Sequence, residues 1–349
     1  MGGGKGEDKN EPLSTENPMP TNIFVTARLP GSSLERLSEK YEVRVFEANR
    51  LPTYEELRDG ASEADALISM VSDPVDKPLI EACPRLRIIS NCGVGYENVD
   101  VGAATERGIF VTNTPGVLTE TVADLAWGLI LAVARRIPEA DAFVREGKFV
   151  GWLPTLLLGV SVHKKTLGIF GMGTIGTAIA RRAKGFNMDV LYHNRGRNKP
   201  AEDELGARRV EFETLLQESD IVVISAPLNE QTLGRFGRDE FSLMKPTSIL
   251  INVGRGQIVR ERALAEALKK GEIWGAGLDV FEREPEVEET LIGLPNVVLL
   301  PHLGSASRET REKMAEMAVT SVERALEGKA PEFLVNPDVN PDASKPTTK

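Results

Sequence analysis

The stretch "GIFGMGTIG" at residues 168–176 decides the fold. It places Gly171, Gly173 and Gly176 in the G-x-G-x-x-G spacing, after the strand-like run 167–170 and at the start of the helix-like run "TIGTAIARRAKGF". Glycines at these points permit a tight turn and let the backbone approach a pyrophosphate, which then rests on the positive N-terminal end of the helix. In this strand–turn–helix context the motif predicts a dinucleotide-binding site rather than a merely structural turn.

Two series of short apolar runs set the fold class. In the first series, strand-like runs alternate with more polar, helix-like segments at 23–27, 43–46, 66–70, 86–90 and 109–113. The second series has the same character and includes the glycine motif, with runs at 165–171, 189–194, 221–227, 248–254, 275–281 and 296–302. This alternation predicts an α/β chain with two doubly wound parallel sheets.

Two long helices are predicted beside these series. "LTETVADLAWGLILAVARR" at 118–136 is largely apolar around its circumference, so we expect a buried helix with Thr119 as its N-cap. Residues 307–328 predict a closing helix in which Met314 contributes to the core. No low-complexity linker separates the two units, so boundaries near positions 116 and 300 rest on the change of series alone.

Length and charge exclude several classes of protein. The 349 residues are 41% hydrophobic, which suits a soluble chain of two compact domains. A formal net charge of −10 disfavours binding to nucleic acid or to an anionic membrane. No apolar run approaches the ~20 residues that span a bilayer, and the first residues lack a signal-peptide pattern, so a cytoplasmic location is expected.

The cysteines and the ends of the chain carry no predicted site. Cys83 and Cys92, the only cysteines, are expected to be reduced and partly buried rather than bonded to each other or to a metal. "GGGKG" at 2–6 follows no strand and lacks the full spacing of a phosphate loop. We therefore expect residues 1–20 to be a disordered leader and 338–349 a flexible tail. No metal site is expected in the chain.

The strand that follows the glycine motif ends in a basic stretch, "LYHNRGRNK" at 191–199. A cofactor with a free ribose 2′-hydroxyl is usually met by Asp or Glu at this point, but the chain offers Asn194, Arg195 and Arg197, and Asp189 lies too early. Guanidinium groups bind a 2′-phosphate through charge-assisted hydrogen bonds. The stretch predicts a preference for NADP(H), with NAD(H) still possible; a solvated basic turn is the alternative.

Three chemically capable residues follow strands of the second series: Arg255, Glu284 and His302. The carboxyl ends of parallel strands line the ligand crevice of an open sheet, so these side chains are expected to converge beside the nicotinamide. None is diagnostic alone, because an isolated Arg or Glu in a loop is usually solvated and a lone His is often structural.

Six motifs in order give the chain, over about residues 22–337, a resemblance to the D-isomer-specific 2-hydroxyacid dehydrogenase family. They are "GVGYENVD" (93–100), "NTPGVLTETVADLA" (113–126), "GMGTIG" (171–176), "NVGRG" (252–256), "GLDVFEREP" (277–285) and "PHLGSAS" (301–307). Within the family the chain looks most like the glyoxylate/hydroxypyruvate reductases, especially through "KGFNMDVLYHNR" (184–195).

The resemblance implies an architecture. A Rossmann cofactor domain, residues 117–299, would be inserted into a flavodoxin-like substrate domain made of 21–116 and 300–337. It also implies a homodimer, with the helix at 118–136 at or near the interface.

The resemblance further implies the reaction, which is NADPH-dependent reduction of glyoxylate or hydroxypyruvate to glycolate or D-glycerate. Protonated His302 would act as general acid on the carbonyl oxygen while hydride reaches the carbon. Glu284 would favour the charged form of the imidazole. Arg255 would bind the substrate carboxylate or carbonyl oxygen and stabilise developing charge.

The family pattern adds contacts for both ligands. The substrate would bind to Val94, Gly95, Arg255 and His302, the first two through backbone N–H groups. Asp279 would lie near the nicotinamide or brace the following turn. The predicted cofactor contacts are Gly171, Met172, Gly173, Thr174, Ile175, Gly176, Asn194, Arg195, Arg197, Val253, Asp279 and Gly304.

Two departures and two alternatives qualify this interpretation. Thr174 stands where many members carry Arg, which leaves fewer charged contacts for the pyrophosphate, and Val94 stands where phosphite-oxidising relatives carry Lys. One alternative is a reductase of bulkier 2-oxo acids such as 2-ketogluconate, with residues 70–73 setting pocket size. The other is a dinucleotide-binding protein like the related corepressors, although no partner-recruiting segment supports it.

Overall fold

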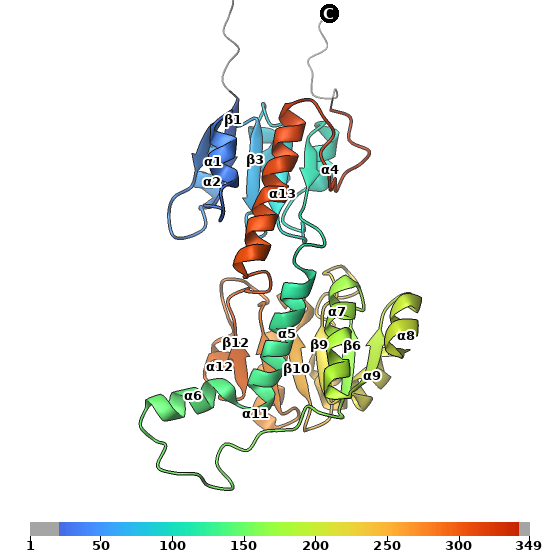
Figure 1. Cartoon of the computed structure of the whole chain (residues 1–349). Coiled ribbons are helices and arrows are strands. Elements are labelled where there is room, and N and C mark those ends of the chain that lie inside the picture. The colour runs from blue at the N-terminus through green and yellow to red at the C-terminus, as the bar shows by residue number, and fades with distance from the viewer. Residues whose placement is uncertain (1–20, 342–349) are drawn as a thin grey trace, which may run out of the picture.

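A computed structural model describes residues 21–341 as two α/β units, stacked one above the other in Figure 1. The predicted fold class is confirmed, because each unit contains one parallel sheet covered by helices, with the strand orders of a flavodoxin-like and a Rossmann domain. The predicted leader, with "GGGKG", lies outside the described residues, as does most of the predicted tail.

The first unit has a five-stranded parallel sheet in the order β2-β1-β3-β4-β5. Its strands are β1 (Asn22–Val25), β2 (Glu42–Val45), β3 (Ala66–Met70), β4 (Ile88–Cys92) and β5 (Phe110–Thr112). Its helices are α1 (Ser33–Ser38), α2 (Tyr54–Ala61), α3 (Lys77–Ala82), α4 (Val101–Glu106) and, from the end of the chain, α13 (Arg308–Leu326). The central strands β3 and β4 are buried along almost their whole length because helices cover both faces of the sheet.

The second unit has a seven-stranded parallel sheet in the order β12-β11-β10-β9-β6-β7-β8. Its strands are β6 (Thr166–Phe170), β7 (Asp189–His193), β8 (Arg208–Arg209), β9 (Ile221–Ile224), β10 (Ile249–Asn252), β11 (Gly275–Leu278) and β12 (Val297–Leu299). The order reverses between β6 and β9, and ligands of open α/β sheets bind at such a switch point.

Helices cover both faces of this second sheet. They are α5 (Thr119–Ala134), α6 (Ile137–Arg145), α7 (Thr174–Ala183), α8 (Lys199–Leu205), α9 (Phe212–Glu218), α10 (Arg238–Leu243), α11 (Glu261–Lys270) and α12 (Glu289–Ile292), with short 3-10 turns η1 (Lys184–Phe186) and η2 (Gly256–Ile258). In Figure 1, α6 and the segment after it project away from the body of the unit.

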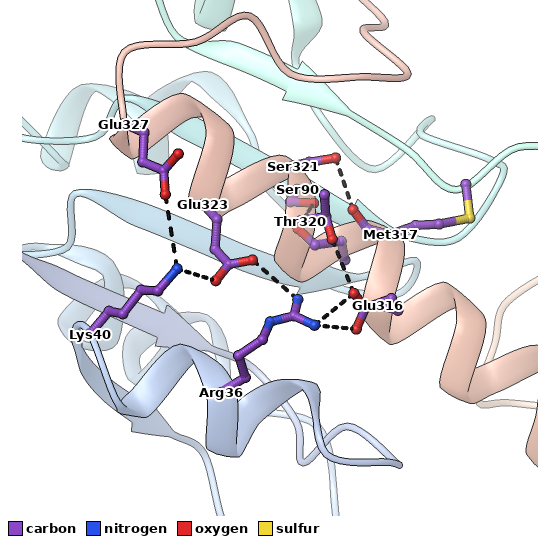
Figure 2. A network of polar contacts seen from close by, with 10 residues as sticks. Arg36, Lys40, Ser90, Glu316, Met317, Thr320, Ser321, Glu323 and Glu327 are labelled. Carbon is purple, nitrogen blue, oxygen red and sulfur yellow. Dashed lines mark hydrogen bonds and ion pairs between the residues drawn. The ribbon is translucent and has the colours of Figure 1, made fainter.

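Helix α13 returns the chain to the first sheet, where it packs against β3, β4 and α1. Figure 2 shows the polar part of this contact: Arg36 of α1 reaches Glu316 at 2.7 Å and Glu323 at 3.1 Å, and Lys40 reaches Glu323 at 3.3 Å. Beneath these ion pairs the Ser90 hydroxyl donates to the backbone carbonyl of Ala318. These half-exposed pairs are each worth little, so burial of apolar side chains is what holds α13 in place.

Helix α5 is largely buried, as its composition predicts, but its predicted cap is wrong. The cap position is Leu118, and Thr119 is the first helical residue, with no side-chain capping bond. Leu118 is buried in the core of the second unit, so apolar packing fixes the entry into the helix. The Trp127 ring stacks on Phe186 of η1 with centroids 4.5 Å apart, and this contact links α5 to the turn that follows α7.

The two cysteines, Cys83 and Cys92, are free thiols, as predicted, and neither is bonded to the other. Burial raises the pKa of both Cys83 and Cys92 to about 11, so neither is a thiolate at neutral pH. Within residues 21–341 no group of His, Cys, Asp and Glu side chains is arranged to hold a metal ion. Among the helices of the same range, none combines the length and apolarity that crossing a membrane requires.

Candidate active site

A cavity of about 370 Å³ lies between the carboxyl ends of the two sheets. The first unit lines it with the loops after β3 and β4, at 70–72 and 92–95. The second unit contributes Val253, Arg255 and Asp279, with Ile175 at the start of α7, and His302 lies just after its edge strand β12. The predicted substrate residues and several predicted cofactor residues therefore meet at one site, although they come from distant parts of the sequence.

The imidazole of His302 is paired with Glu284. Its Nδ1 lies 2.9 Å from Oε2 of Glu284. Burial disfavours the charged carboxylate, but the hydrogen bond and charge of His302, the N–H of Phe281 and the charge of Arg255 together lower the pKa of Glu284 below its usual value. An ionised carboxylate can only accept, so Nδ1 carries the hydrogen, and Nε2, which has no protein partner within residues 21–341, is left for a substrate.

A buried carboxylate fixes the turn that carries His302. His302 has a left-handed backbone, φ 54°, which costs a non-glycine residue about 1–3 kcal/mol and is common at active sites. Asp279 is 1% exposed and accepts the N–H groups of Leu303 at 2.6 Å and Gly304 at 2.8 Å. Burial raises the pKa of Asp279. Of the two predicted roles for Asp279, the geometry displays the bracing of this turn.

Arg255 is positioned by a second buried side chain, Asn252, which the sequence reasoning missed. The amide of Asn252 donates to the carbonyl of Arg255 at 3.0 Å and accepts from the N–H of Gly254 at 3.1 Å. This closes the turn after β10, and the guanidinium then points across the cavity. There its Nη2 lies 3.3 Å from Oε2 of Glu97, on the loop after β4.

Glu97 is thus a second missed residue, and it joins the two units through an ion pair. The signal was present in "GVGYENVD", where an acid stands two residues after the predicted carboxylate-binding glycine. What the sequence could not reveal is that Arg255, 158 positions away, meets it. The same guanidinium fills the space in front of Gly95, where any Cβ would overlap Nη2.

The substrate loop, residues 93–97, presents unpaired backbone donors. The N–H groups of Val94 and Gly95 have no acceptor within residues 21–341, and both residues line the 370 Å³ cavity. Successive free N–H groups next to a guanidinium form a site for a carboxylate.

The glycine loop, which is the motif at residues 171–176, lines a second cavity of about 550 Å³. Gly171 has φ +103°, and a Cβ there would overlap Ala226, while a Cβ on Gly176 would overlap the carbonyl of Gly171. Gly173 faces open space at the N-cap of α7, which has no side-chain cap. The first N–H groups of α7 therefore have neither an intrahelical acceptor nor a capping side chain, as a pyrophosphate site requires.

Among the predicted cofactor residues, Asn194 stabilises this loop through hydrogen bonds to its backbone. Asn194 accepts from the N–H of Met172 at 2.7 Å and donates to its carbonyl at 3.2 Å, and the Met172 side chain is buried. Asn198 also donates to that carbonyl, at 2.9 Å. Thr174 is exposed at the first position of α7, and Gly304 lines the 370 Å³ cavity with Val253.

The two arginines of the basic stretch differ. Arg197 is paired with Glu202 at 2.5 Å, and this guanidinium, followed by the Tyr192 hydroxyl, lowers the pKa of Glu202 to about 2. Arg195 is exposed, and its guanidinium has no partner within residues 21–341. From the sequence alone there was no reason to distinguish the two residues, whereas in the structure Arg197 is in an ion pair and the guanidinium of Arg195 is not.

Comparison with known proteins assigns the family. Residues 127–304 match the model described as "D-isomer specific 2-hydroxyacid dehydrogenase, NAD binding domain". The chain belongs to the D-isomer specific 2-hydroxyacid dehydrogenase family. It is an enzyme that depends on a nicotinamide dinucleotide, as the sequence motifs predicted.

Relatives within the family cover nearly all of the chain. A glyoxylate reductase of Thermococcus litoralis is 49% identical over 325 residues, or 92% of this chain and 98% of the relative. A crystal structure of a Thermus thermophilus protein superposes with a TM-score of 0.85 at 44% identity, covering 90% of this chain and 100% of that one. A Sinorhizobium meliloti NADPH-dependent glyoxylate/hydroxypyruvate reductase, crystallised with NADP and malonate, gives 0.78 at 39% identity, covering 90% and 97%.

Proposed function

We propose that the protein reduces glyoxylate and hydroxypyruvate to glycolate and D-glycerate, with NADPH as the preferred reductant. The observation that carries the proposal is the convergence of the His302–Glu284 pair, Arg255 and the free N–H groups of Val94 and Gly95 on one cavity. The names of the Thermococcus and Sinorhizobium relatives support the choice of substrates.

The side chains divide the reaction between them. A bound reduced nicotinamide supplies hydride to the carbonyl carbon. Arg255 and the N–H groups of Val94 and Gly95 hold the substrate carboxylate and fix the orientation of the carbonyl group. His302 donates its Nε2 proton to the carbonyl oxygen, so that carbon gains the hydride and oxygen the proton. Glu284 stays ionised and stabilises the imidazolium before the transfer.

Cofactor preference rests on Arg195 and on the absence of an acid at the end of β7. The exposed guanidinium of Arg195 is available to a 2′-phosphate, and it lines the same cavity as the glycine loop. Arg197 contributes less, because Glu202 already occupies it. The NADP complex of the Sinorhizobium relative supports the same choice. A cell usually keeps NADPH reduced, so this preference favours the reductive direction.

A bulkier acid is the second candidate, because another cavity of about 490 Å³ meets the first at Ser72 and His302. Its walls are mainly apolar, from Leu51, Phe281 and Leu299 among others. Such walls leave the hydroxyl groups of a sugar acid such as 2-ketogluconate without partners, which costs binding energy. We therefore favour the small acids.

We also propose the domain boundaries of the family pattern and a homodimer. Residues 21–116 with 300–337 form the substrate domain and 117–299 the cofactor domain, because α5 packs on β10 and β11 while α13 packs on β3 and β4.

The proposed homodimer is supported by apolar side chains exposed on and after α6: Val144, Phe149, Val150, Trp152, Leu153 and Leu158. Sedimentation should give twice the 38.1 kDa of one chain; a concentration-independent monomer would contradict the dimer.

Initial rates of NADPH oxidation with glyoxylate, hydroxypyruvate and 2-ketogluconate test the proposed substrates. Turnover of the first two well above the third is expected. The opposite ranking would establish the bulkier-acid alternative. Dinucleotide binding without turnover of any 2-oxo acid would favour a corepressor-like binding role.

A further inference from the structure

A set of buried hydrogen bonds holds the substrate loop from the side opposite its free N–H groups. Three successive carbonyls are engaged: Gly93 accepts from the N–H of Thr114 at 2.9 Å, Val94 from Nδ2 of Asn113 at 2.8 Å, and Gly95 from Nδ2 of Asn91 at 2.6 Å. The donors come from the ends of β4 and β5. In a trans peptide the N–H of the next residue points away from the carbonyl. The bonds to the Gly93 and Val94 carbonyls therefore fix the direction of the N–H groups of Val94 and Gly95, and the bond to the Gly95 carbonyl fixes the peptide that follows.

Gly95 is the residue for which this support matters most. Its Cβ position is occupied by the Arg255 guanidinium, so a side chain at this position would displace the guanidinium from its place in the cavity. Glycine, however, is the residue with the greatest backbone freedom. The peptide before Gly95 is held through Val94 by Asn113, and the peptide after it is held by Asn91. The two amides therefore restore the rigidity that the required glycine removes.

Asn91 stands at the centre of this arrangement. It is fully buried, and while its Nδ2 donates to Gly95, its Oδ1 accepts from the Ser69 hydroxyl at 3.2 Å and from Nδ2 of Asn98 at 3.2 Å. Asn98 in turn donates to the carbonyl of Asp73 at 2.8 Å, in the loop after β3. Both ends of the Asn91 amide are thus used, and its orientation is fixed by Ser69 of β3 and by Asn98 of the loop after β4.

We propose that Asn91 is a positioning residue for substrate binding: by holding the Gly95 carbonyl it fixes the peptide after Gly95, so that this flexible residue cannot turn its N–H away from the direction that Asn113 sets, toward the substrate carboxylate. This inference rests on the proposed function, because it takes a 2-oxo acid as the anion. Asn91 itself contacts no reacting atom. Its loss weakens carboxylate binding and leaves the glycine loop of the other unit as it was.

The test compares Asn91→Asp with the matched control Ser69→Ala. Aspartate keeps the acceptor for Ser69 and Asn98 but replaces the donor to Gly95 with a carboxylate oxygen. Ser69→Ala removes a neighbour of Asn91 and leaves the Gly95 bond in place. The readouts are the inhibition constant of oxamate, a carboxylate analogue of the substrate, the KM and kcat for glyoxylate, and the dissociation constant of NADPH.

We expect Asn91→Asp to raise the oxamate constant and the glyoxylate KM by about 10-fold to 100-fold, the range that misplacement of a binding group produces. The NADPH constant should stay within about twofold of the wild-type value, and Ser69→Ala should change every readout by less than about threefold. Should Asn91→Asp fail to fold, Asn91→Ser, whose hydroxyl is too short to reach Gly95, gives the same comparison.

An unchanged oxamate constant in a folded Asn91 variant would overturn the inference while leaving the proposed function intact. Equal weakening of oxamate and NADPH would also overturn it, because a general loosening of the protein would then explain the loss. A wild-type enzyme that neither reduces glyoxylate nor binds oxamate would overturn the proposed function together with the inference.

Discussion

The two ends of the cofactor cleft are built differently. At the catalytic end each functional group is held by other protein groups: His302 by Glu284, the turn around it by Asp279, and the turn of Arg255 by Asn252. At the end proposed to bind the ribose, the guanidinium of Arg195 is exposed and has no partner within residues 21–341. Preorganised groups give large effects on a reaction, whereas exposed charges are screened and give small ones. We therefore expect removal of the reacting side chain His302 at the catalytic end to change rates far more than removal of Arg195 at the ribose end.

The largest effect is expected from His302→Ala. Removal of a general acid typically costs about 10²–10⁴-fold in rate, so kcat/KM for glyoxylate should fall by that factor. NADPH binding, measured by fluorescence titration, should remain nearly unchanged, because His302 does not line the cavity of the glycine loop. Equal loss of turnover and NADPH binding would show that His302 has been given the wrong role.

Glu284→Gln should have the next largest effect. Glutamine can still accept from Nδ1 but lacks the negative charge that stabilises an imidazolium, so kcat/KM at neutral pH should fall about tenfold, the difference between a charged and a neutral hydrogen bond. A kcat/KM equal to that of the wild type would contradict the proposed electrostatic role.

The same carboxylate has a consequence for stability. Because folding lowers the pKa of Glu284, its ionised form stabilises the folded chain above the unfolded value of about 4.5. That contribution is lost as the pH falls through the lower folded value. The difference in melting temperature between wild type and Glu284→Gln should therefore be constant near neutral pH and shrink in acid.

At the ribose end, Arg195→Ala should raise the KM for NADPH by about tenfold, as expected for a hydrogen bond to a charged group, and leave the KM for NADH unchanged. Arg197→Ala is the matched control and should have a smaller effect, because Glu202 already neutralises part of that charge. If the Arg195 variant weakened both cofactors alike, the guanidinium would contact the shared pyrophosphate rather than the 2′-phosphate.

Glu97→Gln should have the smallest effect. The ion pair with Arg255 is partly exposed, and such pairs are worth about 0.2–1 kcal/mol, so releasing Arg255 should lower the KM for glyoxylate about twofold to fivefold. The difference should shrink at high ionic strength. A higher KM would mean that Glu97 orients Arg255 instead of competing with the substrate for it.

The fold, and the placement of Arg255, Glu284 and His302 around one cavity, could be predicted from the sequence because both depend on local signals. The glycine motif, the apolar runs and the polar residues just after strands can each be seen within a short window. The supporting contacts cannot be seen that way: Arg255 meets Glu97 only because the two sheets face each other. Asn91 likewise reaches Gly95 through the fold of a loop. The wrong cap at Thr119 has the same origin, since burial of Leu118 overrode the local preference.

The most direct test of the central claim is the ratio of kcat/KM for NADPH to that for NADH, measured with saturating glyoxylate at physiological ionic strength. We expect rapid reduction of glyoxylate and a ratio of about 10 or more in favour of NADPH, through the charge of Arg195. Rapid reduction with a ratio near or below one would contradict the role of Arg195 and leave the roles of His302, Glu284 and Arg255 unaffected. No reduction with either cofactor would contradict the proposed reaction and the cofactor preference together.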